Sequence, residues 1–417
     1  MKKRGVGDEL NKPRRGEIPE YQSKPCLEFK KNEMSLIIQN NVHQSISERQ
    51  ELIIKHPLYS QYQSIVDKIL NQQRISDADA LALYHIHDLS YLSLLADYAN
   101  YLKNQDKVYY NRNIHIEPTN ICVYSCAFCS YSRLIKQKEE GWQYTIEDIL
   151  NILKKYDHQP ITEVHITGGV IPQQDLNFYI ELFKQIKKHR DIHIKALTPV
   201  EIHYISKKAK LSYAETLEKL MEAGLDSMPG GGAEIFNKEI RDKIAGGKCT
   251  TEQWLEIHRI WHHKGKRSNA TMLYGHIETY EHRVEHMRLL RELQDETAGF
   301  QAFIPLKFRN KNNQMSNVPE VSIVEDMKNY AVARLYLDNF QHLKAYWAML
   351  GRHNAQMALH FGANDLDGTI DDTTKIYSMA GSEEQHPSMT TEEIEQLILQ
   401  SKKIPIERDT LYNPIKR

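Results

Sequence analysis

The chain has 417 residues, which is long enough to bury one large core or two ordinary ones. Its formal net charge is −1 and no basic stripe alternates with aromatic residues, so the composition gives no reason to expect nucleic-acid binding. No apolar run approaches the roughly 18 residues that cross a bilayer, and the N-terminus has no signal-peptide pattern. We therefore expect a cytoplasmic protein that acts on a small molecule, without nucleic acid and without membrane insertion.

The first part of the chain divides into a tail and a helical layer. Residues 1–45 begin with a segment rich in Lys, Arg, Glu and Pro, which predicts a flexible or draped tail. Met34 within the tail is a second possible start of the chain. In residues 46–107 apolar side chains recur at helical spacing, so we expect a layer of helices, able to cap one end of the main domain.

Residues 108–417 alternate short β-like runs with longer amphipathic segments. This alternation is typical of βα units, and eight such runs predict an α/β fold of the (β/α)8, TIM-barrel type, followed by C-terminal helices. The predicted strands are residues 112–117, 161–167, 192–197, 225–228, 267–274, 299–305, 342–347 and 356–361.

Polar side chains alternate with apolar ones along these strands. In the first strand Asn113, His115 and Glu117 share one face, opposite Ile114 and Ile116. Because barrel interiors are normally apolar, convergent polar residues predict a binding cavity. The alternative is that each is a satisfied core group or is exposed. The other members of this polar set are Glu163, His165, Thr167, Lys195, Asn269, Gln301, Gln356 and His360.

Three of the five cysteines lie in a CxxxCxxC loop directly after the first predicted strand: Cys122, Cys126 and Cys129. A structural zinc site normally has four ligands, whereas an iron–sulfur cubane held by three thiolates keeps one iron open for a small molecule. We therefore predict a [4Fe-4S] cluster, with a zinc site or a plain thiol loop as alternatives. The isolated Cys26 and Cys249 are expected to be inert reduced thiols.

A CxxxCxxC loop after the first strand of a βα barrel resembles the radical S-adenosylmethionine (SAM) superfamily. The resemblance implies that the three cysteines bind three irons and that SAM chelates the fourth through its amino and carboxylate groups. Electron transfer from the cluster would then cleave SAM to methionine and a 5′-deoxyadenosyl radical. Phe128 matches the aromatic position near adenine in this superfamily, and a packing role is the alternative.

Two further segments match positions that bind SAM in the superfamily. Thr167, Gly168 and Gly169 follow the second strand, where the motif for the SAM amino group lies, but Val170 replaces the glutamate of many members. An ordinary turn is the alternative. Glu201 lies where a ribose-binding carboxylate is common, and an exposed glutamate at a helix start is the alternative.

Over residues 111–381 the sequence resembles the aminodeoxyfutalosine synthase family of the futalosine route to menaquinone. The segments that carry this resemblance are NICVYSCAFC, GLDSMPGGGAEIF, RSNATMLYGHIET, RELQDETAGFQAFIPL, LDNFQHLKAYWAMLG and ALHFGANDLDGT. The cyclic dehypoxanthine futalosine synthases and the deazaflavin-forming enzymes share the cysteine loop and the PGGGAE segment, and the other segments favour the aminodeoxyfutalosine synthase family.

This resemblance implies that the deoxyadenosyl radical adds to the enol-ether carbon of 3-[(1-carboxyvinyl)oxy]benzoate, with aryl migration and loss of carbon dioxide. The substrate has two carboxylates, so donors should line the lumen. Glu117 and His276 are candidates to manage protons. An electron donor such as flavodoxin or ferredoxin is implied. The candidate substrate-binding residues are His115, Lys195, Gly231, Arg241, Asn269 and His360.

Several of these features have simpler explanations, and two other functions remain open. Gly231 lies in a glycine loop whose amides are able to bind an anion or ribose, but such a loop is often only a turn. Asp365 and Asp367 near the chain's end are equally compatible with a turn. A cyclic dehypoxanthine futalosine synthase would release free 5′-deoxyadenosine, and a non-enzymatic iron–sulfur electron carrier would normally use four protein ligands.

Overall fold

The computed structural model describes residues 44–370, 375–382, 385 and 387–416. Most of the predicted tail, with Cys26 and Met34, lies outside the described residues. None of the helices within these ranges is long and apolar enough to span a membrane.

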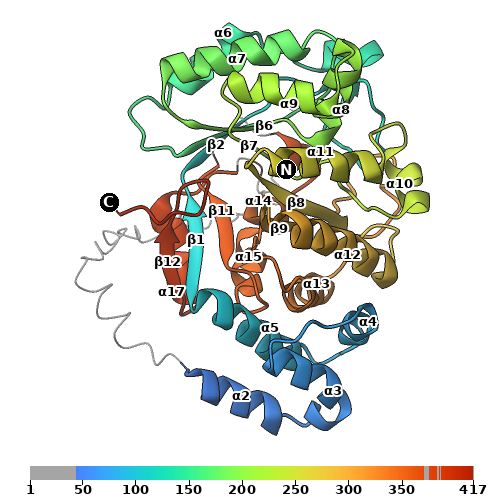
Figure 1. Cartoon of the computed structure of the whole chain (residues 1–417), viewed down its shortest axis with the longest axis vertical. Coiled ribbons are helices and arrows are strands. Elements are labelled where there is room, and N and C mark those ends of the chain that lie inside the picture. The colour runs from blue at the N-terminus through green and yellow to red at the C-terminus, as the bar shows by residue number, and fades with distance from the viewer. Residues whose placement is uncertain (1–43, 371–374, 383–384, 386, 417) are drawn as a thin grey trace, which may run out of the picture. The chain divides into compact units, whose positions relative to one another are not determined.

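A parallel sheet of seven strands forms the centre of the fold, in the order β10, β9, β8, β7, β6, β5, β2 (Figure 1). All neighbouring pairs in it are parallel, which confirms the α/β class and the curled, barrel-type sheet expected from the alternation. The strands are β2 (Asn113–Ile116), β5 (Glu163–Ile166), β6 (His193–Ala196), β7 (Ser227–Met228), β8 (Arg267–Tyr274), β9 (Phe300–Lys307) and β10 (His342–Leu343).

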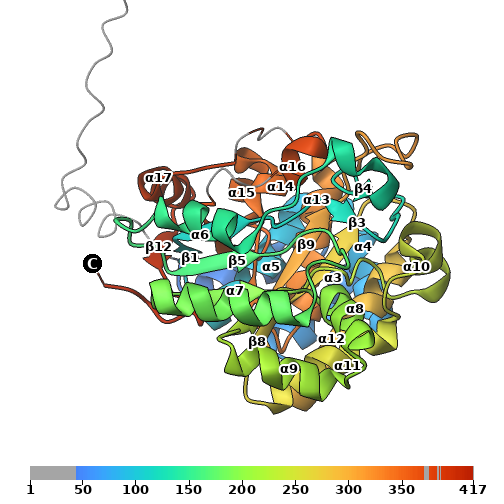
Figure 2. The same cartoon turned by 90° about the horizontal axis from the view of Figure 1, so that it is seen from above.

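Helices connect these strands and cover the outside of the sheet. Seen from above, β5 runs between α6 and α7, and both helices share a core with it (Figure 2). Several helices begin with a capping box; at α9, Ser212 accepts the N–H of Glu215. The helices are α6 (Ile146–Lys154), α7 (Leu176–His189), α8 (Pro199–Ala209), α9 (Tyr213–Glu222), α10 (Lys238–Ala245), α11 (Thr251–His263), α12 (Tyr280–Thr297) and α13 (Ile323–Tyr336).

A second, three-stranded sheet fills the gap between β10 and β2. Its strands are parallel and lie in the order β11 (Asp365–Gly368), β1 (Lys107–Asn111) and β12 (Ile404–Glu407). Lys344, just after β10, forms a parallel bridge with Asp365. On the other side, Asn113 in β2 accepts the Ile370 N–H at 3.0 Å through Oδ1. The strand β11 therefore occupies the eighth position around the barrel.

The prediction of an eighth strand over residues 356–361 is wrong. This stretch contains the end of α15 (Arg352–Ala358) and a following turn, because Ala355, Ala358 and Leu359 are buried at helical spacing. His360 is exposed there. The other helices near the C-terminus are α14 (Trp347–Leu350), α16 (Ile376–Met379) and α17 (Thr391–Gln400).

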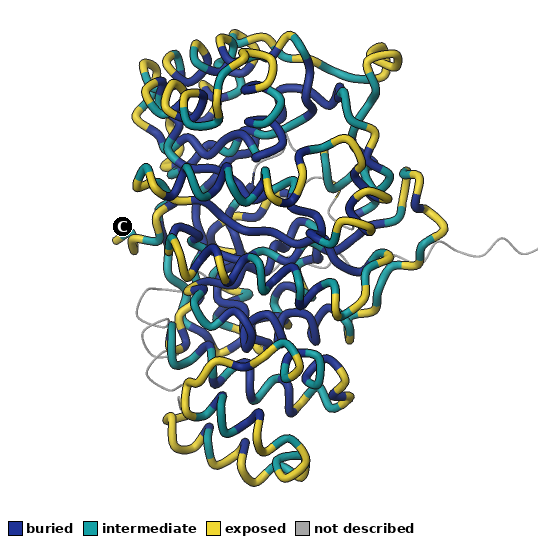
Figure 3. The backbone as a smooth tube through the Cα atoms, turned by 45° about the vertical axis from the view of Figure 1, so that its right-hand side comes forward, coloured by how far each residue is buried: buried dark blue, intermediate teal, exposed yellow. Residues whose placement is uncertain are grey.

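The apolar faces of the strands pack outward against the helices. Ile114 and Ile116 of β2, with Val164 and Ile166 of β5, lie in a core that also contains Phe183 of α7. The polar residues between them point to the other side of the sheet, as the alternation predicted. Figure 3 shows the buried backbone concentrated in the centre of the fold, with exposed residues on the outer helices.

Four helices precede the barrel: α2 (Ile46–Lys55), α3 (Tyr59–Leu70), α4 (Asp77–Tyr84) and α5 (Leu89–Asn104). They do not cap an end of the barrel. Instead α5 packs on α13, and α4 packs on α12 and α13, which themselves cover β8 and β9 (Figure 1). A hydrogen bond of 2.8 Å from Tyr84 to Asn329 ties the two layers together. The segment therefore forms a third layer on one flank.

Because this layer shares a core with the barrel, Leu95→Ala in α5 should destabilise the whole fold. Leu95 is fully buried, so its loss should cost about 3 kcal/mol of unfolding free energy, measured by chemical denaturation. Leu52→Ala in α2 is the matched control, because Leu52 is 42% exposed and should cost about 0.5 kcal/mol or less. Equal effects would show that α5 does not belong to the cooperative core.

Candidate active site

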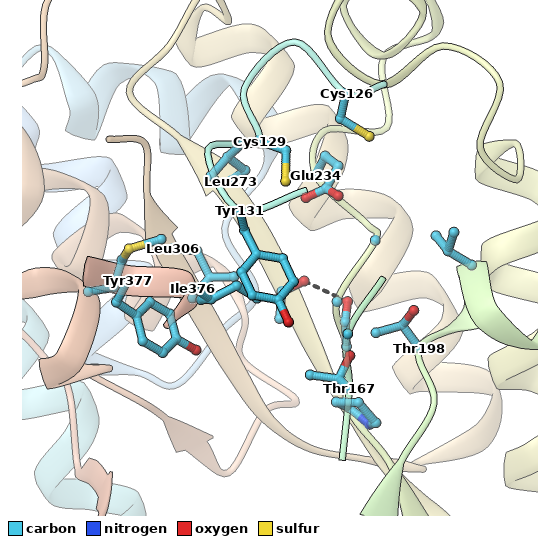
Figure 4. Close-up of a pocket in the computed structure, with 18 of the residues that line it drawn as sticks. Cys126, Cys129, Tyr131, Thr167, Thr198, Glu234, Leu273, Leu306, Ile376 and Tyr377 are labelled. Carbon is cyan, nitrogen blue, oxygen red and sulfur yellow. Dashed lines mark hydrogen bonds between the residues drawn. The ribbon is translucent and has the colours of Figure 1, made fainter. Parts of the chain in front are cut away.

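A cavity of about 300 Å³ opens at the carboxyl ends of the parallel strands. The cysteine loop and the loops after β5, β6 and β7 form one end of it, and side chains of β2, β5, β6, β8 and β9 form its walls. Figure 4 shows Cys126, Cys129 and Glu234 gathered at one end, with Tyr377 and Leu306 on another wall. Barrel enzymes keep their chemistry at this end of the strands.

Backbone hydrogen bonds hold the cysteine loop in place. The Val123 N–H donates to the Val170 carbonyl at 2.8 Å, and the Ala127 N–H donates to the Ile244 carbonyl at 2.8 Å. The Cys122 Sγ accepts the N–H groups of Tyr124 and Val170, both at 3.4 Å. Two amide donors on one sulfur are the surroundings that stabilise a thiolate ligand.

The three thiols fit a cluster better than a single ion. Burial raises the pKa of the Cys122 thiol, and that of Cys126 to about 11, so these groups ionise at neutral pH only when a metal binds them. Across the described residues, no three His, Cys, Asp or Glu side chains are placed to hold one metal ion. In a cubane each thiolate binds a different iron, so the sulfur atoms need not converge on one point. A single zinc ion would need side chains that converge on one point, and the described residues do not provide them.

Gly168 and Gly169 are required by close packing. A Cβ at Gly168 would lie 2.6 Å from the Thr119 carbonyl oxygen, and one at Gly169 would lie 2.0 Å from that of Ile121. The Gly169 N–H also donates to the Thr119 carbonyl at 2.7 Å. The loop after β5 therefore lies directly against the backbone that leads to Cys122, and any side chain would push the two apart.

Glu201 is buried beside this loop, not exposed at a helix surface. Its Oε2 accepts the Thr198 N–H at 2.6 Å and the Thr167 hydroxyl at 3.3 Å. Burial raises the pKa of Glu201 to about 7, although these hydrogen bonds lower it. The carboxyl group lines the cavity together with Gly168 and Gly169.

Glu234 and Lys248 form an ion pair at the cysteine end, and sequence reasoning did not identify Lys248. Lys248 Nζ lies 2.8 Å from Glu234 Oε1 and 5.3 Å from the ring centroid of Phe128. Glu234 follows the glycine loop with φ of +47°, a left-handed backbone that is unusual for glutamate. In that loop a Cβ at Gly230 would lie 2.5 Å from the Asn269 carbonyl oxygen. Close packing therefore requires glycine at position 230. Glu234 follows this loop and lines the cavity.

Deeper in the cavity lies a group of charged and imidazole side chains, which we call the lumen layer. His115, His165 and Lys195 are register partners on β2, β5 and β6. Lys344, just after β10, and Asp367, on β11 beside β2, interact electrostatically with His115 and form an ion pair with each other. The alternation predicted His115, His165 and Lys195, but it did not single out Lys344, and the sequence left Asp367 open between a site residue and a turn residue.

The cavity brings together most of the predicted site residues. Its lining contains Cys122, Cys126, Cys129, Phe128, Thr167, Gly168, Gly169, Glu201, His115, Lys195, Gly231 and Asn269. Cys249 is buried as a free thiol outside this lining, where burial raises its pKa.

Two predicted substrate-binding residues do not reach the cavity. The Arg241 guanidinium donates to the carbonyls of Gly232, Ala233 and Cys249, so its donors hold the glycine loop instead of a ligand. His360 is on the exposed surface after α15, because the strand predicted there does not form. Neither residue lines the cavity.

The two predicted proton-managing residues also lie outside the cavity lining. His276 Nε2 lies 3.1 Å from the Leu273 carbonyl and its Nδ1 lies 3.2 Å from Glu278, which keep the ring fully buried in its loop. The Glu117 carboxylate accepts the N–H groups of Lys375 and Ile376. Since Ile376 lines the cavity, Glu117 holds this part of the cavity wall in place.

Two family models match the chain in succession. The radical SAM superfamily model covers residues 116–290, and the model described as the CofH/MqnC C-terminal region covers residues 297–416. The fold agrees: the crystal structure of methylornithine synthase superposes with a TM-score of 0.64 at 17% identity, over 82% of this chain and 97% of that one.

Curated relatives show which family within the superfamily the chain is most similar to. The aminodeoxyfutalosine synthase of Thermus thermophilus is 43% identical, over 84% of this chain and 95% of that enzyme. The cyclic dehypoxanthine futalosine synthase of Streptomyces coelicolor is 34% identical, over 84% of this chain and 88% of that enzyme. With the cysteine loop, both family models and the identity to the first relative in agreement, the chain belongs to the radical SAM superfamily and, within it, to the aminodeoxyfutalosine synthase family.

Proposed function

We propose that this protein joins the 5′-deoxyadenosyl group of SAM to 3-[(1-carboxyvinyl)oxy]benzoate, with aryl migration and loss of carbon dioxide, to form aminodeoxyfutalosine for menaquinone biosynthesis. The observation that carries this proposal is 43% identity to the Thermus thermophilus enzyme across 95% of its length. The cavity supports it, because the cysteine loop and the charged lumen line the same cavity.

Cys122, Cys126 and Cys129 would hold the [4Fe-4S] cluster. When bound, the cluster supplies the electron that converts SAM into methionine and a 5′-deoxyadenosyl radical. The chain's own residues hold SAM in place. Its amino-acid end would lie against the Glu234–Lys248 ion pair, whose carboxylate and ammonium match an amine and a carboxylate in charge.

The adenosine part of SAM would extend from the cysteine end toward the loop after β5. Phe128 lines this part of the cavity and would lie beside adenine, with the backbone of Thr167, Gly168 and Gly169 on the other side. Glu201 would accept hydrogen bonds from the ribose hydroxyls, because its carboxyl group is buried at the same wall.

The proposal also covers the electron donor, the location of the protein and the absence of a nucleic-acid partner. The low-potential electron would come from a protein such as flavodoxin or ferredoxin, in the cytoplasm. No nucleic acid would take part, since the near-neutral chain offers no extended basic surface segment in its sequence.

The direct test is an anaerobic assay with reconstituted protein, reductant, SAM and 3-[(1-carboxyvinyl)oxy]benzoate, with the products identified by mass spectrometry. We expect a product with the mass of aminodeoxyfutalosine. Free 5′-deoxyadenosine as the only adenosine-derived product would contradict the proposal and favour the cyclic dehypoxanthine futalosine synthase reaction, for which dehypoxanthine futalosine is then the substrate to supply.

Replacing one cluster ligand should remove the cluster. We expect Cys126→Ala to lower iron and sulfide, measured chemically after reconstitution, from about four of each per chain to less than about one. Cys249→Ala is the matched control, because this free thiol lies outside the cavity lining and should leave both values unchanged. Equal iron in the two variants would contradict the assignment of the ligands.

The raised pKa of Glu201 predicts a pH dependence for the binding of 5′-methylthioadenosine, which has the ribose and adenine of SAM but no amino acid. Only the ionised carboxylate can accept from both hydroxyls, and a pKa of about 7 means that its ionised fraction rises as pH rises. Affinity measured by calorimetry should therefore increase roughly tenfold from pH 6 to pH 8. The same increase in Glu201→Gln would rule out Glu201 as its source.

A further inference from the structure

A second cavity, of about 500 Å³, also borders the cysteine loop, and we call it the outer groove. It shares Cys126, Cys129 and Ser132 with the active-site cavity. Ser125, between Cys122 and Cys126, is exposed and lines the outer groove but not the active-site cavity. The other residues that line the groove are Arg133, Leu134, Gln137, Asn312, Asn313, Gln314 and Ser316. The cysteine loop therefore borders the active-site cavity and, through Ser125, the protein surface.

The loop after β9 connects the outer groove to the cysteine loop. The Gln314 N–H donates to the Ala127 carbonyl at 2.9 Å, and the Ser130 hydroxyl donates to the Lys311 carbonyl at 2.5 Å. Gln314 is exposed, and Ala127 directly follows Cys126 in the chain. A molecule that contacts Gln314 from outside is therefore connected through a single hydrogen bond to the backbone beside a proposed cluster ligand.

An exposed apolar side chain lies next to the groove. The 3₁₀ helix η1 (Ile135–Glu140) directly follows the groove residues Arg133 and Leu134, and its first residue, Ile135, is 48% exposed. One exposed isoleucine is common on protein surfaces. Here it adjoins a polar groove, and an apolar contact inside a polar rim is the usual composition of a protein interface. Electron-transfer partners use interfaces at the small end of the size range, so this limited surface suits such a complex.

Positive charge predominates along the same two segments. Lys136 and Lys138 lie in η1, and Lys311 lies in the loop after β9. All three are exposed, and none forms an ion pair with another residue in the part of the chain that the structure describes. Glu139 and Glu140 are the acidic residues of η1, and Glu140 is 3.6 Å from an arginine of the groove. An acidic partner would therefore be attracted to this surface and a basic one repelled.

From these observations we infer that the outer groove is the docking site of the protein that delivers the electron, and that this carrier presents an acidic surface around its redox group. The inference rests on the proposed function in one respect, because a carrier has a reason to bind here only if the three cysteines hold the cluster. In the complex one electron passes from the reduced carrier to the oxidised cluster, and no bond forms or breaks.

Binding of an oxidised carrier tests the charge of this surface without turnover. The probe is a flavodoxin with a net negative charge, titrated by calorimetry into the reconstituted protein at about 0.1 M salt, where charges more than about 10 Å apart are largely screened. Lys136→Glu with Lys138→Glu should weaken binding about tenfold or more, because two attractions become repulsions. Lys184→Glu with Lys188→Glu is the matched control. It changes the net charge equally at two exposed lysines of α7, outside the groove, and should leave the affinity within about twofold of wild type.

Ile135→Ser separates direct contact from long-range attraction, because this substitution changes no charge. We expect flavodoxin to bind this variant about fivefold more weakly, since an apolar side chain buried in the complex is lost. Ile54→Ser in α2 is the matched control. Ile54 is 47% exposed and lies outside the groove, so the affinity should stay at the wild-type value.

The outcomes separate this inference from the proposed function. No binding by the wild type, or unchanged affinity in either groove variant, would overturn the inference even if the protein makes aminodeoxyfutalosine. A fall in iron content, or weaker binding of 5′-methylthioadenosine, in the groove variants would also overturn it, because this surface would then serve the cluster or the SAM site and not a carrier. Weaker binding of flavodoxin alone, in the groove variants alone, would support the inference even if aminodeoxyfutalosine were not formed, and the proposed reaction alone would then be wrong.

Discussion

The contact between two backbones, at Gly169 and Ile121, is the constraint on which the rest of the site depends. It brings the loop after β5 against the loop after β2, so that the Val170 N–H reaches the sulfur of Cys122. Any Cβ at Gly169 would enter the Ile121 carbonyl, so a side chain at this position would push the two loops apart. The parallel register of the strands then places every other functional group at the same end of the sheet.

The interior of this barrel contains charged side chains where barrels normally pack apolar ones. Burying charged groups costs several kcal/mol each unless they are paired, and most of the charged residues in the lumen are paired, as in Lys195 with Glu163 and Lys344 with Asp367. Such pairs contribute little net stability, so stability is better explained by the apolar core between the sheet and its helices. The charged lumen is then best understood as a binding surface, which is where local folding rules are usually broken.

Most of the sheet could be predicted because period-2 alternation marks one buried face. Seven of the eight predicted strands overlap observed ones, and β8 has the predicted bounds. The closing strand β11 was not predicted because its acidic residues, Asp365 and Asp367, are typical of turns. In the fold they form ion pairs with Arg408 and Lys344, which come from distant segments. The short range of a sequence pattern explains the other errors too: nothing near Arg241 or His276 indicates that backbone carbonyls take up their polar atoms.

The central claim is that one cavity holds SAM at its cysteine end and the second substrate in its lumen. An anaerobic crystal structure of the reconstituted protein with SAM and 3-[(1-carboxyvinyl)oxy]benzoate tests it most directly. The account predicts the second substrate in the lumen of this cavity and the ribose beside Glu201. Either molecule bound outside this cavity would contradict it.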